Sequence, residues 1–412
     1  NQFKLRGSWG ELGNQNTSNL YPFYEILPVK SNSGNWLVNG GKTNTADIPS
    51  LVSTLLTWER VRSFNVGFDF GAFSNRLTGS FDYFVRKTVD MVGPAPQLPL
   101  VLGIAPAIVN NADMKSYGFE IELSWRDRIG EVDYGVKFNL ADAQQKVVKY
   151  PNTTNAFSDW YAGKMSGEIW GYTSLGIAKT DEEMKEHLAS LPNGGQNQLG
   201  NKWGAGDIMY ADINGDGKVD GGKGTLADPG DQRIIGNSTP RYNFGLVLDA
   251  SYKGFDVSIF FQGVGKRDYA PIVGTNGAVF WGAVNNIWQS MAMEEHFDYF
   301  RPEGHPMGAN LNGYYPRPDF TSNKNHQVQT RYLQDASYIR LKNLQIGYTL
   351  PKQWINKLHI NRCRVYVSGD NLWTGTSLAS MFDPETLAAG DWGSGKTYPL
   401  SKVISFGLNV NF

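Results

Sequence analysis

Cysteine, charge and long apolar runs are all scarce in this sequence. Its single cysteine, Cys363, excludes an intrachain disulfide. Charged residues make up only 19% of the 412 residues and the formal net charge is −1, which argues against a nucleic-acid or other polyanionic partner. The most apolar segment, residues 98–109, is interrupted by Pro99 and Pro106, whereas a membrane-spanning helix needs about 20 apolar residues. The sequence therefore does not predict a helical membrane protein.

Aromatic residues and glycine, in contrast, are abundant, and apolar residues recur with a period of two. The last ten residues, 403–412, alternate without interruption between an apolar and a polar side. This segment alone fits the final strand of a soluble sandwich as well as a strand of a membrane barrel. A soluble sheet edge of this kind invites aggregation, whereas in a closed barrel the apolar side faces lipid. The apolar side consists of Ile404, Phe406, Leu408, Val410 and Phe412.

Ten such runs follow one another along the chain. They lie near residues 3–9, 64–70, 77–85, 117–125, 132–140, 242–252, 255–261, 344–350, 363–367 and 403–412. The connections between them alternate in length. The short ones are 71–74, 127–130, 253–254 and 351–361, and the long ones are 13–57, 90–113, 144–239, 264–335 and 374–402. Transmembrane barrels show this alternation because tight turns lie on the periplasmic side and large loops outside.

The sequence thus predicts an all-β fold, a transmembrane antiparallel β-barrel with long extracellular loops. We expect residues 1–412 to form one part of a single barrel domain, with extracellular loops at 144–239 and 264–335. Within these loops a helix is expected from Thr180 to about Leu188, because Thr180 and Glu183 have capping-box spacing. A second helix is expected at 286–295. Trp58, Trp125, Tyr252 and Tyr348 lie near strand ends and fit interfacial aromatic girdles.

The first long loop contains a calcium-type motif at 212–220. Oxygen ligands stand at positions 1, 3, 5 and 9 of the motif, and the glycine at position 6 permits a sharp turn. Position 12 is Lys223 instead of glutamate, so Asp231 or Asp228 is expected to replace it. We interpret the motif as a structural Ca²⁺ site that fixes a loop with little core of its own; the alternative is a turn without metal. The expected ligands are Asp212, Asn214, Asp216, Lys218, Asp220 and Asp231.

Two weaker sets of residues also lie in the loops. Glu294, Glu295, His296 and His305 could suggest zinc, but their spacing matches no strong template and a solvated loop is the better interpretation. Tryptophan rings in loops suit sugar rings or peptide side chains, although each could equally pack its own loop. The candidate substrate-binding tryptophans are Trp160, Trp203, Trp281, Trp288 and Trp392. No catalytic cluster appears, so no enzyme is predicted.

Several longer segments carry a family resemblance. RYLQDASYIRLKNLQIGYTLPKQW at 331–354 and RVYVSGDNLWTGTS at 364–377 closely resemble the C-terminal part of SusC/RagA-type TonB-dependent transporters. The same resemblance is carried by KLRGSWGELGNQN, GDIMYADINGDGKVD, IIGNSTPRYNFGL, MFDPE and the closing FGLNVNF, which occur in family order. An insertion, GGKGTLADPG at 221–230, departs from the family pattern.

The resemblance implies the last ten strands of a 22-stranded outer-membrane barrel, the class with a plugged lumen. It implies that the plug, the TonB-coupling segment and the other strands lie outside this chain, and that Phe412 ends a strand read by the barrel-assembly machinery. The expected function is active import of oligosaccharides, or of peptides, in a bacterial outer membrane, energised through TonB. The expected partners are a SusD-like surface lipoprotein, TonB, the rest of the barrel, membrane lipid and the substrate.

Two other classes of function remain open. A passive porin or a surface adhesin could be built on the same barrel without energy coupling, and a plug domain before residue 1 would exclude both. An outer-membrane enzyme with its site on the loops is a third possibility, which the lack of a catalytic cluster disfavours. The sequence does not separate glycan from peptide import, although its neutral charge balance and many tryptophans lean toward glycan.

Overall fold

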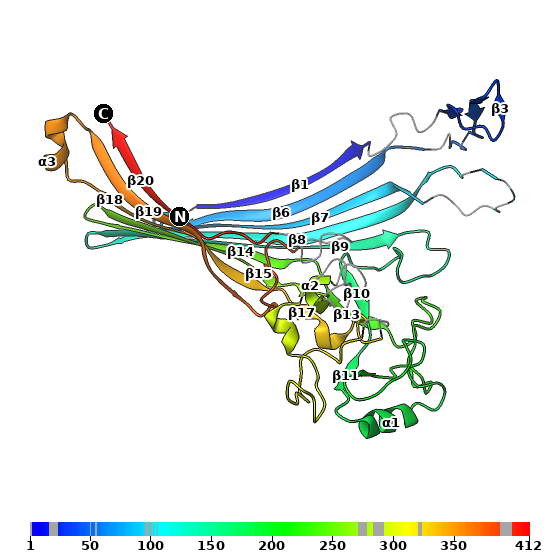
Figure 1. The fold of residues 1–412 in the computed structure, drawn as a ribbon. Coiled ribbons are helices and arrows are strands. Elements are labelled where there is room, and N and C mark those ends of the chain that lie inside the picture. Colours follow the sequence, from blue (N-terminus) through cyan, green and yellow to red (C-terminus); the bar gives the residue numbers. More distant parts are fainter. Residues whose placement is uncertain are drawn as a thin grey trace.

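Ten long strands form one curved antiparallel sheet in the computed structural model, and each pairs with the next long strand along the chain (Figure 1). The structure describes residues 2–15, 24–49, 51–53, 56–94, 99, 101, 103–104, 106–270, 278–282, 292–319, 324–387 and 398–412. The ten strands are β1 (Gln2–Asn14), β6 (Glu59–Ala72), β7 (Leu77–Gly93), β8 (Val109–Ile129), β9 (Val132–Lys149), β14 (Arg241–Tyr252), β15 (Phe255–Lys266), β18 (Tyr338–Thr349), β19 (Arg362–Thr376) and β20 (Val403–Asn411). The predicted number and order of strands are confirmed.

The register of the sheet gathers the apolar residues on one face. Residues directly opposite one another in neighbouring strands share a face, and one such row crosses β1, β6, β7, β8, β9 and β14. It consists of Leu5, Phe68, Phe81, Ile121, Leu140 and Phe244. Phe68 stacks on Phe81 with ring centroids 5.6 Å apart. Much of this face is exposed, and Phe406 in β20 is 85% exposed. An exposed apolar face of this extent is typical of a surface that meets lipid or another protein.

The opposite face of the sheet is polar. Arg6 of β1 donates hydrogen bonds to Asp69 of β6 and Asp82 of β7, over distances of 2.7–3.2 Å. Farther along the sheet, Arg364 of β19 pairs with Asp256 of β15. In the described part of the chain, no helix combines the length and the apolar character that crossing a membrane requires.

The connections alternate as predicted, but the strands are longer than predicted. β14 and β15 are joined by two residues with positive φ, Lys253 (48°) and Gly254 (89°), a conformation that suits tight hairpins. β8 has 21 residues and β9 has 18. The polar residues at 144–146 continue β9 because they still pair with β8, for example Lys146 with Lys115. The long loops therefore span 150–240 and 267–337, instead of 144–239 and 264–335.

Short elements fill the connections. The helices are α1 (Asp181–Ala189), α2 (Ala278–Trp281), α3 (Lys352–Ile355) and the 3-10 turns η4 (Glu294–Phe297), η5 (Thr330–Tyr332) and η6 (Asn356–Leu358). The short strands are β2 (Val29–Lys30), β3 (Leu37–Val38), β4 (Gly41–Lys42), β5 (Thr45–Ala46), β10 (Glu168–Gly171), β11 (Ser174–Ile177), β12 (Ile208–Tyr210), β13 (Arg233–Asn237), β16 (Asp268–Tyr269) and β17 (Gln334–Asp335). α1 confirms the first predicted helix; most of the second, at 286–291, lies outside the described residues, and its described end forms η4.

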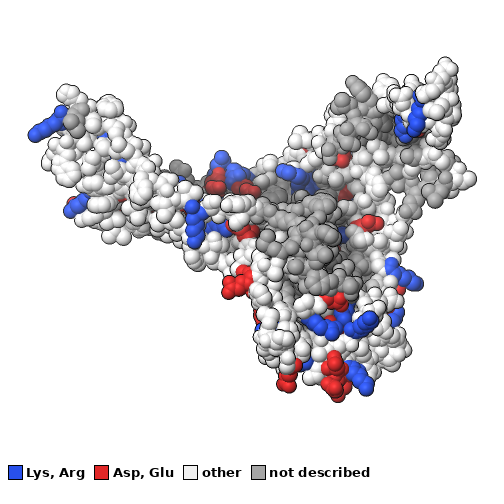
Figure 2. Space-filling model, in the orientation of Figure 1, with Lys and Arg blue, Asp and Glu red and all other residues white. Residues whose placement is uncertain are grey.

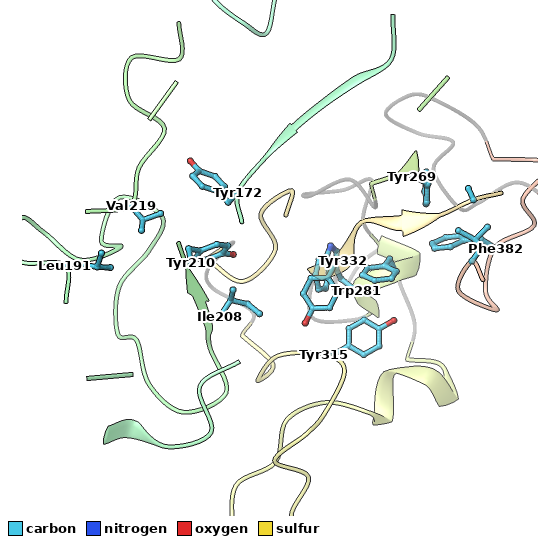
Figure 3. Packing of buried hydrophobic residues seen from close by; sticks show 13 residues of the cluster. Tyr172, Leu191, Ile208, Tyr210, Val219, Tyr269, Trp281, Tyr315, Tyr332 and Phe382 are labelled. Carbon is cyan, nitrogen blue, oxygen red and sulfur yellow. The ribbon is translucent and has the colours of Figure 1, made fainter. Parts of the chain in front are cut away.

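The long loops pack into one body beside the sheet, which we call the loop module: residues 150–240, the described parts of 267–337, and 377–387 (Figure 1). Its core contains Tyr172, Leu191, Ile208, Tyr210, Val219, Tyr269, Phe280, Trp281, Tyr315, Tyr332, Ala336, Leu378 and Phe382 (Figure 3). The expectation that the loop has little core of its own is therefore wrong. The core residues follow no regular period in the sequence, so the pattern of apolar residues did not reveal them.

Candidate functional site

The calcium-type loop is held in shape by its own carboxylates. Asp212 accepts hydrogen bonds from the backbone N–H groups of Gly215 (2.7 Å) and Gly217 (2.8 Å). The side-chain oxygen of Asn214 accepts from the backbone of Asp216 (2.9 Å). Both glycines have positive φ, 75° and 82°, which explains why glycine occupies these two positions. The sequence motif thus forms the tight turn that its spacing predicts.

The loop is anchored to the module by Val219 and Asp231. Val219 is fully buried in the core, and its N–H donates to Gly195 O (2.8 Å). The carboxylate of Asp231 accepts from the N–H groups of Ile213 (2.7 Å) and Asp220 (2.8 Å). Burial raises the pKa of Asp231, although these N–H groups oppose that effect. Of the two aspartates expected to complete the motif, the structure brings Asp231 against the loop.

The donor set of this loop fits a hard divalent cation such as Ca²⁺, which binds carboxylate, amide and backbone oxygens. Among the described residues, no three acidic, histidine or cysteine side chains converge closely enough to hold a metal by themselves. A calcium ion would therefore depend on the Asn214 amide and on a backbone carbonyl, which position 7 of the motif assigns to Lys218. The Lys218 ammonium pairs with Asp220 and lowers the pKa of that carboxyl. This pair is the contact that a bound cation would replace.

The structure separates the candidate tryptophans. Trp160 is 40% exposed and lies beside Lys164, whose ammonium is 5.8 Å from its ring centre. Trp203 is partly buried against Tyr210, and its indole N–H donates to Gly200 O (3.1 Å). Trp281 is a core residue and is 3% exposed. Among these three, no ring contact joins one tryptophan to another. Trp288 and Trp392 lie outside the described residues.

A pocket of about 160 Å³ opens beside Trp281. Its walls come from α2, from η4 with the residues just before and after it, and from two segments, 315–318 and His326. Sequence reasoning missed this pocket because its residues are spread over 46 positions, from 281 to 326, without a motif. The close pairing of His326 with Trp281, with ring centroids 4.5 Å apart, exists only in the folded chain.

Two of the four possible zinc ligands, Glu295 and His296, make hydrogen bonds within the module. His296 Nδ1 accepts a hydrogen bond from the N–H of Met293 (2.9 Å), and its Nε2 lies 3.1 Å from the carbonyl oxygens of Val279 and Phe280. Glu295 accepts from the hydroxyl of Ser380 (2.7 Å). His296 therefore serves to connect η4 to α2.

Comparison with known proteins decides the family. A family model described as "TonB dependent receptor-like, beta-barrel" matches residues 1–372. The chain belongs to this family. The TonB-dependent receptor P3 of Formosa agariphila is 28% identical over 440 residues, covering 100% of this chain and 39% of that protein. The TonB-dependent receptor SusC of Bacteroides thetaiotaomicron is 21% identical over 425 residues, covering 99% of this chain and 37% of that protein.

A solved structure, described as that of the RagAB peptide transporter, has the same fold. It superposes with a TM-score of 0.70 and 22% identity, over 100% of this chain and 41% of that chain. The chain thus spans about two fifths of the length of the proteins it matches. The SusC/RagA resemblance seen in the sequence is confirmed. The chain is part of a TonB-dependent receptor barrel in the bacterial outer membrane, and its family is one of transporters, not of enzymes.

The family explains the two faces of the sheet. The exposed apolar face meets lipid, and the polar face with the Arg6 and Arg364 ion pairs lines the lumen. Aromatic residues gather at the short-turn end, where Trp125 donates a hydrogen bond to the Tyr134 hydroxyl (3.1 Å) and Tyr348 lies against Phe255 (4.5 Å between centroids). These residues fit an interfacial aromatic girdle at that end of the sheet. The loop module lies at the opposite end of the sheet, with the long connections.

Proposed function

We propose that the whole receptor actively imports oligosaccharides or peptides across the outer membrane, with TonB supplying the energy. The observation that carries the proposal is the loop module. Five long connections leave one end of the ten-stranded sheet, which we call the wall, and three of them contribute to one packed core. A folded module of this kind is a rigid platform for ligand at the mouth of a polar lumen. A passive porin has no need of one.

In this proposal the receptor performs no bond chemistry. Ligand is held at the extracellular loops beneath a SusD-like surface lipoprotein, and displacement of a plug lets it enter the lumen. Two proteins support this assembly: SusC, to which the chain is similar in sequence, and the RagAB transporter, whose structure has the same fold as this chain. An adhesin would also present a rigid module, so uptake is the property that separates the two functions.

Uptake by whole cells tests the proposal. Cells that express the full-length receptor and its lipoprotein would be given one pool of fluorescent oligosaccharides and one of fluorescent peptides, each too large for porins. We expect accumulation of one pool that disappears when TonB is deleted. Uptake that persists without TonB would establish the passive porin, and surface binding without uptake of either pool would establish the adhesin.

We further propose that the loop at 212–220 binds one structural Ca²⁺ that stabilises the loop module. The test is the double variant Asp212→Ala with Asp216→Ala, compared with wild type for bound calcium and for protease resistance of the module. Calcium at 100 times its dissociation constant is expected to stabilise the wild-type module by about 2.7 kcal/mol. Unchanged calcium content in the double variant would refute the assignment.

A further inference from the structure

A row of basic side chains crosses four neighbouring strands on the apolar face of the wall. Its members stand directly opposite one another in β6, β7, β8 and β9. They are Arg62, Lys87, Lys115 and Lys146. They share a face with Phe68 and Phe81, because residues an even number of positions apart in a strand point the same way. The row lies at the end of the wall from which the long connections leave.

The row adjoins the apolar band of the wall. In β6, β7 and β8 the last apolar residues before the row are Phe64, Val85 and Tyr117, which also stand directly opposite one another. The ammonium of Lys115 lies 5.0 Å from the centre of the Tyr117 ring, within range of a cation–π interaction. A molecule that touches the basic row can therefore lie along the apolar band at the same time.

Three lysines of this row repel one another. Lys87 faces Lys115, and Lys115 faces Lys146. Directly opposite residues have Cβ atoms about 4.5–5.5 Å apart, and like charges in such pairs destabilise the sheet. Lys87 and Lys146 are exposed, so an outside partner can reach them. We call Lys87, Lys115 and Lys146 the lysine row.

The carboxylates at this end of the wall serve other groups. Glu11 accepts from Arg62 (2.6 Å), and Asp90 accepts from Arg60 (3.0 Å). The carboxylate of Asp113 accepts from the backbone N–H of Asp90 (2.9 Å). In the part of the chain that the structure describes, no ion pair involves the lysine row. The row therefore has three positive charges for which the described residues supply no counter-charge.

The position of the lysine row defines the class of its partner. Basic side chains at the edge of an apolar band meet the headgroups of the surrounding leaflet, and they attract anionic lipids. Lysine binds phosphate as a compact point charge. A free anion would touch the charges alone, whereas a lipid touches both the charges and the apolar band. The surface is therefore complementary to a phosphorylated lipid.

We infer that the lysine row binds the phosphate of a lipid headgroup, with the acyl chains of that lipid along the apolar band of β6, β7 and β8. Long connections of outer-membrane barrels lie outside the cell, which assigns this lipid to the outer leaflet. The inference concerns the wall and depends neither on the cargo nor on TonB. It therefore goes beyond the proposed function, and each can fail without the other.

The experiment is native mass spectrometry of the purified full-length receptor in detergent. The probes are monophosphoryl lipid A, which has a phosphate and acyl chains, diacylglycerol, which has acyl chains alone, and inorganic phosphate. The test variant is Lys87→Gln with Lys115→Gln. The matched control is Arg86→Gln with Lys137→Gln, which removes two positive charges from the polar face of β7 and β9.

We expect wild type to bind monophosphoryl lipid A on the order of ten-fold more tightly than the test variant, since two cations near the headgroup are lost. The control variant should bind it as wild type does. Diacylglycerol should bind weakly to all three proteins, and inorganic phosphate should not displace the lipid.

Equal binding of monophosphoryl lipid A by wild type and the test variant overturns the inference. Displacement of the lipid by an equal concentration of inorganic phosphate also overturns it, because the row would then be a site for free anions. The test variant should melt no lower than wild type in detergent, since it loses a repulsion between neighbouring strands. If the test variant does not fold, equal binding of monophosphoryl lipid A and diacylglycerol by wild type overturns the inference.

Discussion

The wall and the loop module use the same residue types in opposite ways. In the wall, aromatic side chains such as Phe406, which is 85% exposed, lie on the outward apolar face. In the module they point inward, and Tyr332 is 2% exposed. The charged residues are also placed differently. The Arg6 ion pairs lie on the polar face of the wall. In the module, acidic and basic residues gather at the tip near α1 (Figure 2). The chain therefore contains one region whose surface suits lipid, the wall, and one region whose surface suits water, the loop module.

The difference teaches where the stability of each region comes from. The wall satisfies its backbone by strand pairing, and its apolar face is stabilised only when lipid surrounds it. The module behaves like a small soluble domain and even buries a charge, since the fully buried Asp207 accepts from Lys324 (2.8 Å) and Asn325 (2.9 Å). A change in one region should therefore leave the other largely intact.

The largest effect is expected from Phe280→Ala in the module core. Phe280 is 1% exposed and lies within ring contact of Tyr332, Tyr315 and Trp281. Its truncation should destabilise the module by about 3–5 kcal/mol. Limited proteolysis of the long loops should accelerate, while the heat-modifiable gel mobility of the wall stays unchanged. Loss of both properties together would show that the two regions fold as one unit.

The reciprocal change places arginine on the outward face of the wall. Val66 lies on the apolar face near the middle of β6, and the adjacent Asn65 lies on the polar face. Val66→Arg should destabilise the wall by about 2–4 kcal/mol, because arginine in the middle of a bilayer is poorly solvated. Asn65→Arg is the matched control and should have little effect. The midpoint of urea unfolding in lipid vesicles measures both, and equal midpoints would contradict the assignment of the faces.

The module should also lose stability in mild acid, through His326. Burial lowers the pKa of His326 from 6.5 to about 4, and the carboxylate of Asp319 opposes this effect. The folded state therefore favours the neutral His326 ring. The free energy of unfolding of the module is highest above pH 6.5, the ordinary pKa of histidine, and decreases as the pH falls toward 4. At pH 5 the loss should be about 2 kcal/mol, since each pH unit is worth about 1.4 kcal/mol. Proteolysis rates of wild type and His326→Gln at pH 7.5 and 5 measure this difference. The same pH dependence in both proteins would exclude His326 as its cause.

The comparison also explains what the sequence could predict. Wall residues such as those of β20 alternate strictly because one face meets lipid and the other the lumen, so their strands, order and connections could be read from the sequence. Core residues of the module, such as Tyr172 and Phe382, recur with no regular spacing, because the residues against which they pack lie far away in the sequence. Asp212 to Asp220 could be recognised because a calcium-type loop is local. The contact between Trp281 and His326 could not be predicted from the sequence, because only tertiary packing brings the two rings together.

The smallest effect is expected from Thr180→Ala at the start of α1. The Thr180 hydroxyl accepts from the N–H of Glu183 (3.1 Å), while the Glu183 carboxylate accepts from the N–H of Lys179 (2.6 Å), one residue before the position in a standard capping box. Removing the hydroxyl should lower the stability of the module by about 1 kcal/mol. Thr180→Ser keeps a hydroxyl at this position and should avoid this loss. α1 is joined to the module through the buried Met184, so the loss belongs to the module alone. Hydrogen exchange should accelerate several-fold at the first amides of α1 and not in β8 or β9. Faster exchange in those wall strands would mean that a helix cap in the module supports the barrel, and the independence of the two regions would be disproved.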